Sequence, residues 1–239
     1  MEKSAASKRR RIRKNDRFEM KQISPIGERQ SAIFKAFDEN FHLLIHGVPG
    51  TGKTFISMGL ALDEILYGGG PYKKLYIVRS LVQSRDMGFL PGNQKEKAEA
   101  YESAYMAITT ELFEREDAYD ILKNRNLLEF KPTSFLRGLN FRDCIVMVDE
   151  CQNMNDMELH TIITRATDTC RLIFLGDNQQ DDLTNERKRE KSGFPEFMTL
   201  IKKMKSIKSF EMTIDDIQRG GLVREYILTK LAHHIPVLR

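Results

Sequence analysis

The chain has 239 residues, of which 41% are hydrophobic and 30% are charged, so it is not disordered throughout, and its length suits one α/β domain with a sizeable core. No apolar run approaches the roughly 18 residues of a membrane span, and the basic N-terminus lacks the apolar stretch of a secretory signal, so we expect a cytoplasmic protein without a membrane partner. The three cysteines form no CxxC pair and the five histidines form no HExxH motif, which argues against a disulfide framework and against a zinc site.

The net positive charge of the chain is concentrated in its first residues. Residues 1–17 contain eight lysine and arginine residues and two acidic residues, so this segment has a net charge of +6. The remaining residues have a net charge of −2, which gives +4 for the whole chain. Residues 1–19 also lack apolar periodicity, and we expect a disordered basic tail there, followed by a single domain over residues 20–239. Such a tail binds polyanions without sequence preference, or it serves only as a solubilising arm.

Apolar periodicity beyond the tail predicts strands that alternate with helices. The predicted helices cover residues 28–38, 53–67, 94–125, 156–165, 194–204 and 217–233. The predicted strands cover residues 41–46, 75–78, 127–131, 144–148, 172–175 and 209–212. Short buried strands that alternate with helices are typical of a parallel sheet with helices on both faces, so we predict an α/β fold.

The segment between the first predicted strand and the second predicted helix reads Gly47-Val48-Pro49-Gly50-Thr51-Gly52-Lys53-Thr54. It fits the phosphate-binding motif GxxxxGK[ST] in the strand–loop–helix setting that the motif requires, which disfavours a glycine-rich turn that matches by accident. The glycines allow backbone N–H groups to wrap a phosphate chain, and the N-terminus of the following helix attracts its negative charge. We therefore expect ATP here, with Lys53 on the β- and γ-phosphates and the Thr54 hydroxyl on Mg²⁺.

Two carboxylates, Asp149 and Glu150, follow the strand predicted at residues 144–148. In open α/β sheets the carboxyl ends of the strands carry the ligand. Asp149 is therefore expected to hold Mg²⁺, directly or through water, and Glu150 to act as the general base that deprotonates the attacking water. The alternative is a pair of acids that only cap a strand, which the upstream phosphate-binding loop disfavours.

A second polar motif, Gly176 to Gln180, follows the strand predicted at residues 172–175. Because this strand also ends at the carboxyl edge of the predicted sheet, Gln180 is expected to contact the γ-phosphate or its attacking water. Taken alone, the motif equally suits a plain polar loop after a strand.

The order of these motifs resembles superfamily 1 helicases, and the whole set resembles the PhoH-like family, including the short versions that bacteriophages carry. The matching segments are residues 47–54, 88–92, 137–138, 149–153, 176–181, 216–219 and 222–223. The resemblance implies one RecA-like ATPase core, a ring that is often hexameric, and an RNA or DNA helicase role, in the host cytoplasm if the chain is phage-encoded. Cys151 stands where alanine is usual, and we expect neither the nuclease nor the RNA-binding domain of some relatives.

Several further side chains are candidates for contacts with the nucleotide or with nucleic acid. Gln30 precedes the loop, where helicases often place a glutamine that reads adenine, or it is a surface residue of a helix. Arg219 and Arg137 are candidate arginine fingers supplied by a neighbouring subunit, or ordinary surface residues. Phe89 packs on a base among basic side chains that follow a nucleic-acid backbone, or lies in the core below a charged loop; these basic residues are Arg79, Arg85, Lys95 and Lys97.

Together these features predict a Mg²⁺-dependent ATPase that acts as an oligomeric, helicase-like motor or remodeller on RNA or single-stranded DNA. The alternatives are a P-loop kinase of a small molecule and a nucleotide switch that hydrolyses slowly. A kinase needs an acceptor pocket where this chain has Glu150 and Gln180, which are suited to placing water. An intact Glu150 also argues against a purely binding role.

Overall fold

Six parallel strands form one sheet in the computed structural model, which describes residues 18–81, 94–177, 191–218 and 220–233. Across the sheet the strand order is β3-β2-β4-β5-β1-β6, and every neighbouring pair is parallel. The strands are β1 (His42–Gly47), β2 (Lys74–Arg79), β3 (Leu128–Pro132), β4 (Cys144–Asp149), β5 (Cys170–Gly176) and β6 (Ile207–Met212). Each lies within two residues of its predicted bounds, so the predicted parallel sheet is confirmed.

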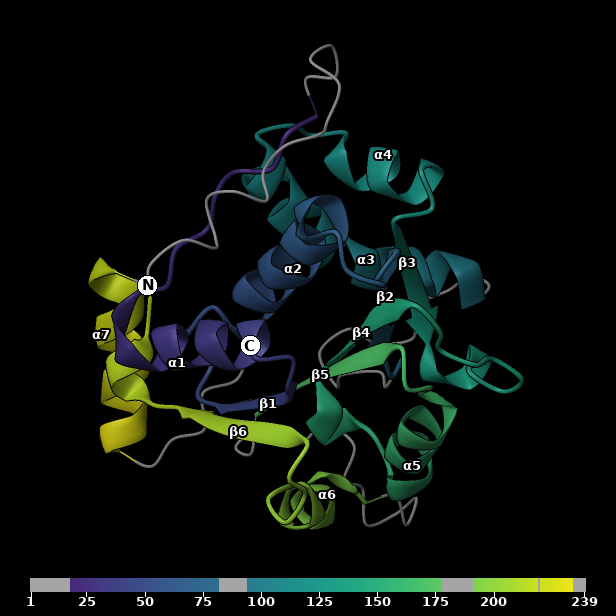
Figure 1. The fold of residues 1–239 in the computed structure, drawn as a ribbon. Helices are drawn as coiled ribbons and strands as arrows, with labels where there is room; N and C mark the ends of the chain where they lie inside the picture. Colours follow the sequence, from purple (N-terminus) through teal and green to yellow (C-terminus); the bar gives the residue numbers. More distant parts are fainter. Residues whose placement is uncertain (1–17, 82–93, 178–190, 219, 234–239) are drawn as a thin grey trace, which may run out of the picture.

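Helices cover both faces of this sheet, as predicted. In Figure 1, α1 to α4 lie on one side, α5 and α6 lie on the other, and α7 lies beside α1 at the β6 end. The helices are α1 (Gly27–Asp38), α2 (Lys53–Asp63), α3 (Gln94–Phe113), α4 (Ala118–Asn124), α5 (Asp156–Arg165), α6 (Phe194–Ile201) and α7 (Gly221–Ala232). Within the described ranges, no helix is both long and apolar enough to cross a membrane.

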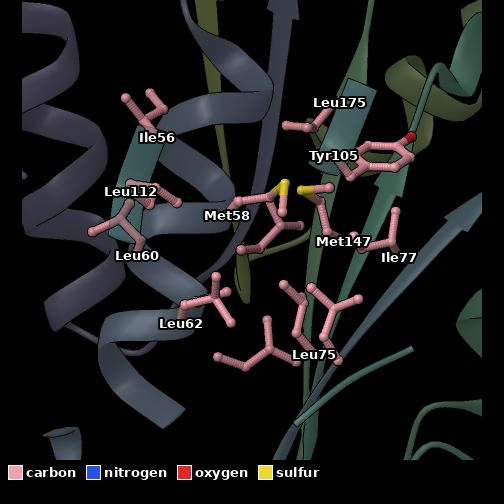
Figure 2. Packing of buried hydrophobic residues seen from close by; sticks show 14 of the residues in the cluster. Ile56, Met58, Leu60, Leu62, Leu75, Ile77, Tyr105, Leu112, Met147 and Leu175 are labelled. Carbon is pink, nitrogen blue, oxygen red and sulfur yellow. The ribbon is translucent and has the colours of Figure 1, made fainter. Parts of the chain in front are cut away.

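The apolar core is divided by the sheet because successive strand residues point to opposite faces. Leu43 and Ile45 of β1 pack on the α1–α4 side, whereas Leu44 packs on the α5–α6 side. Helix α2 is buried nearly all round, and Figure 2 shows its Met58 and Leu62 among side chains of the sheet. Each such fully buried side chain contributes about 1.5–3 kcal/mol. This burial fixes the helix that follows the phosphate-binding motif.

Three predicted helix bounds are wrong, for local reasons. The helix predicted over residues 94–125 is two helices, because Glu114 adopts a left-handed φ of 53° and ends α3. The helix predicted over residues 194–204 ends at Ile201. The helix predicted to begin at residue 217 begins at Gly221, after a 3₁₀ turn from Ile214 to Asp216.

The packed body begins before residue 20. Phe18, which the sequence pattern assigns to the basic tail, is 3% exposed and stacks on Phe113 with their ring centroids 4.5 Å apart. The guanidinium groups of Arg115 and Arg125 lie 5.8 and 5.0 Å from the Phe18 ring. The expected boundary at residue 19 is therefore wrong, and Phe18 belongs to the core.

Arg171 of β5 is a buried cation that links the sheet to the end of α1 through hydrogen bonds. Its Nε donates to the carbonyl of Phe41 at 3.1 Å, and its Nη2 donates to the carbonyl of Phe37 at the end of α1. The guanidinium also lies 3.6 Å from the Phe37 ring centroid. Burial lowers the pKa of Arg171 to about 10, so the group remains charged at neutral pH.

Arg171→Met is expected to lower the free energy of unfolding by about 1–3 kcal/mol, because two buried carbonyls lose their donor. Removing a buried charge offsets part of the loss. Urea unfolding followed by circular dichroism measures the change, and Arg142→Met, at an exposed position, is the control. Equal stability of the two variants would mean that the Arg171 contacts do not stabilise the fold.

Candidate functional site

The phosphate-binding motif forms a loop of unusual backbone conformation between β1 and α2. Gly47, Gly50 and Gly52 have φ values of 116°, 77° and 80°, a region that favours glycine. At Gly47 a Cβ would lie 2.1 Å from the Met212 carbonyl oxygen of β6. The helix begins directly after Gly52, so its free N–H groups face the loop. The predicted strand–loop–helix arrangement is confirmed.

Backbone contacts hold this loop from the β6 side. Val48 N donates to the Met212 carbonyl at 3.1 Å, and Gln218 N donates to the Gly50 carbonyl at 3.0 Å. Ile217, which precedes Gln218, packs on Val48 and on Ile227 of α7. Ile217, whose backbone is extended, and Gln218 therefore support the loop, which explains why the last helix begins later than predicted.

Lys53 lies over its own loop. Its Nζ donates to the carbonyls of Gly47 at 2.7 Å and Val48 at 2.8 Å, and the residue is 8% exposed. Phosphate oxygens are stronger acceptors for an ammonium group than neutral carbonyls are. A phosphate chain in the loop is therefore expected to draw Lys53 away from these carbonyls.

Gln30 joins α1 to the same loop. The residue is 2% exposed; its Oε1 accepts from Ile26 N at 2.8 Å, and its Nε2 donates to the Thr51 carbonyl at 3.4 Å. It is thus a buried residue rather than a surface residue of a helix. Both ends of its amide contact backbone in this arrangement, and the adenine contact stays a prediction.

Asp149 and Glu150 follow β4 at the carboxyl edge of the sheet. Asp149 is 5% exposed, and its Oδ2 accepts from the Tyr105 hydroxyl at 2.8 Å while its Oδ1 accepts from Glu150 N at 3.1 Å. Glu150 has a left-handed φ of 55°, a conformation that costs about 1–3 kcal/mol outside glycine. Such local strain is typical of functional sites, where surrounding contacts hold it in place.

Gln152 connects the acidic turn to the neighbouring strand. Its Nε2 donates to Oε2 of Glu150, and its Oε1 accepts from Asp177 N at 3.0 Å. Because β5 lies between β4 and β1, Asp177 is placed between the acidic turn and the phosphate-binding loop. Gln152 lies in the matching segment 149–153 without a role predicted from the sequence, although its fixed spacing from Glu150 is a usable signal.

Arg79, one of the basic residues considered for contact with a nucleic-acid backbone, lies beside the acidic turn. It ends β2 directly opposite Asp149 in the β2–β4 register, with its guanidinium 5.0 Å from the Tyr101 ring centroid. Burial alone would lower its pKa, but the neighbouring Tyr105, Asp149 and Glu150 raise the pKa above its usual range. Arg79 is therefore a charged part of the acidic site.

Of the remaining candidate site residues, the structure describes some and leaves others outside the described ranges. Arg137 is exposed in the turn after β3. Gln180, Arg219, Arg85 and Phe89 lie outside the described residues. Lys95 and Lys97 lie on α3, where the structure does not describe their side chains.

The donor set suits Mg²⁺ together with a nucleotide. Thr54 offers a hydroxyl and Asp149 a carboxylate, both oxygen donors of the kind that Mg²⁺ prefers. Over the described ranges, no three or more His, Cys, Asp or Glu side chains gather as a metal cluster.

Comparison with known proteins matches this architecture to a family. The model of the PhoH-like protein family matches residues 22–230. The chain belongs to this family. A PhoH-like protein of Bacillus subtilis is 30% identical over 90% of this chain and 66% of its own length, and one of Synechocystis is 28% identical over 83% and 59%. The chain thus spans less than two thirds of these relatives.

A solved structure supports the fold. The large terminase of a thermophilic bacteriophage, in complex with ADP, is similar over 87% of this chain and 50% of its own, with a TM-score of 0.50 and 11% identity. At this identity the likeness concerns the fold alone. With the glycine-rich loop between β1 and α2, it identifies a P-loop NTPase fold of the RecA-like α/β class.

Proposed function

We propose that the chain is a Mg²⁺-dependent ATPase that acts as an oligomeric motor or remodeller on nucleic acid, RNA or single-stranded DNA. The observation that carries the proposal is the Gln152 bridge, which joins Glu150 to the end of β5 beside the phosphate-binding loop. A phosphate chain in the loop would thus face a carboxylate suited to activating water. The buried, strained Glu150 has this role at a position where a kinase would need its acceptor.

In the proposed reaction, backbone N–H groups of residues 47–54 bind the phosphates while Lys53 moves from the loop carbonyls to the β- and γ-phosphate oxygens. Thr54 and Asp149 would hold Mg²⁺, which would supply positive charge to offset the negative charge of the phosphates. Glu150 accepts the proton of the attacking water, with its carboxylate oriented by Gln152.

Further residues are proposed to contact the γ-phosphate or the nucleic acid. Gln180 is proposed to contact the γ-phosphate, and Arg219 or Arg137 to reach it from a neighbouring subunit of a ring, hexameric as in family members. Phe135, 52% exposed, lies two residues before exposed Arg137 in the turn after β3. An aromatic ring beside a cation suits single-stranded nucleic acid, and the basic tail at residues 1–17 adds attraction for its phosphates.

We propose a cytoplasmic location, in which the three free cysteines stay reduced.

Single-stranded RNA or DNA is expected to raise ATP hydrolysis by the full chain by about 5- to 150-fold, the range of typical coupling between two sites. The variant Phe135→Ala, which removes the exposed ring and leaves Arg137 in place, is expected to lose most of this stimulation and to keep the basal rate. Phosphate release at increasing concentrations of each strand measures both, and Met157→Ala, an exposed apolar residue on α5, is the control. Hydrolysis that ignores both nucleic acids would contradict the motor and favour a switch.

A further inference from the structure

Asp149 accepts hydrogen bonds from two parts of the chain, α3 and the acidic turn itself. Tyr105 comes from α3 on the α1–α4 side of the sheet and is fully buried, with its hydroxyl 2.8 Å from Asp149 Oδ2. The backbone of Glu150 contacts the other oxygen, so both oxygens of Asp149 are held in place. A ring at this position fills the core equally well without its hydroxyl, so packing against Phe130 does not explain why the residue is tyrosine.

Arg79 balances the charge at the same place. Asp149 and Glu150 are adjacent carboxylates, both less than 9% exposed, and two buried like charges destabilise each other. Arg79 lies directly opposite Asp149 across the β2–β4 pair, and its side chain passes the Tyr101 ring. The ends of β2 and β4 and the middle of α3 thus meet in a cluster made of Arg79, Tyr105 and Asp149.

We propose that Tyr105 and Arg79 are positioning residues of the metal site: Tyr105 fixes the orientation in which the Asp149 carboxylate meets Mg²⁺·nucleotide, and Arg79 compensates the two carboxylates when no metal is bound. Neither residue touches substrate; both act through Asp149. The inference rests on the proposed function and adds to it the residues that set its metal affinity. A carboxylate held in one orientation loses less freedom when it binds the ion, so metal affinity depends on the Tyr105 hydroxyl.

The chain contains a matched control for this tyrosine. Tyr119 of α4 is 1% exposed and donates its hydroxyl to Glu102 Oε2 at 2.7 Å, with Lys123 Nζ also 2.7 Å from that oxygen. Both clusters combine a buried phenol, a carboxylate and a cation. The Tyr119 cluster lies between α3 and α4, and none of its members comes from the carboxyl edge of the sheet.

The test compares Tyr105→Phe with Tyr119→Phe in the full chain. Electron paramagnetic resonance follows Mn²⁺ binding in the presence of ADP, fluorescent ADP in EDTA reports metal-free nucleotide binding, and thermal unfolding reports folding. Tyr105→Phe is expected to weaken Mn²⁺ binding by about 10-fold, the lower end for such supporting residues, and to leave ADP binding in EDTA unchanged. Tyr119→Phe is expected to keep wild-type Mn²⁺ affinity.

Wild-type Mn²⁺ affinity in Tyr105→Phe would overturn the inference, and an equal loss in both variants would reduce Tyr105 to a structural role. Should Tyr105→Phe fail to fold, Arg79→Gln decides: it removes the cation that offsets the two carboxylates, so its expected result is tighter Mn²⁺ binding with ADP binding in EDTA intact, and unchanged Mn²⁺ binding overturns the inference. Failure of the proposed function is distinct, since the wild-type chain would then neither hydrolyse ATP nor bind Mn²⁺ in an ADP-dependent manner.

Discussion

Glu150→Gln is expected to lower the turnover number for ATP by about 10²- to 10⁴-fold, the usual contribution of a general base, and to leave nucleotide affinity nearly unchanged. Glutamine keeps the shape of the side chain and an oxygen that accepts from Gln152 Nε2, but it cannot take the proton of water. The substitution therefore separates chemistry from geometry. Single-turnover hydrolysis and equilibrium binding of a fluorescent ATP analogue measure the two effects.

Glu129→Gln is the control, since Glu129 of β3 is paired with Lys74 and Lys131. It is expected to hydrolyse ATP at the wild-type rate. A Glu150→Gln variant that retains more than a tenth of wild-type turnover would move the general base elsewhere. An alanine substitution at Glu150 would be harder to interpret for two reasons. Alanine would lose the contact with Gln152 as well as the proton acceptor, and the backbone at this position is left-handed.

The phosphate-binding loop and the acidic turn were predictable because each depends on neighbouring residues in the chain. Residues 47–54 specify their own conformation through glycine spacing, and the apolar runs before Asp149 and Gly176 specify strands that end at one edge. Parallel strands cannot place these ends elsewhere, so the motifs meet without any knowledge of long-range contacts. The strand order, which puts β5 between β1 and β4, then brings Gln152 to Asp177.

The remaining site residues depend on contacts that no local pattern encodes. Tyr105 is one of several tyrosines on or near α3, and only the packing of α3 on the sheet brings its hydroxyl to Asp149, 44 positions away. The sequence pattern places Arg79 only among the basic residues near Phe89. The register of β2 with β4 instead places it beside two carboxylates. Ile217 likewise has helical periodicity, but its contact with Val48 decides its conformation.

Lys53→Ala is expected to lower ATP hydrolysis by about 10²- to 10³-fold, the usual effect of removing one preorganised donor from a developing charge. The Lys53 ammonium is the cation that lies against the loop carbonyls, close enough to exchange Gly47 and Val48 for phosphate oxygens. The loop glycines and the α2 N-terminus remain, so nucleotide binding is expected to weaken and not to vanish. Hydrolysis assays and titration with fluorescent nucleotides measure the two quantities.

The comparison of ATP with ADP makes this prediction specific to Lys53. If its ammonium contacts both the β- and the γ-phosphate, the substitution costs more affinity for a non-hydrolysable ATP analogue than for ADP. Equal losses would place Lys53 on the β-phosphate alone, and the γ-phosphate would then need another cation. Lys202→Ala, at an exposed position after α6, is expected to change neither affinity. Loss of ADP binding without unfolding would show that Lys53, rather than the backbone of the loop, supplies most of the attraction for the phosphates.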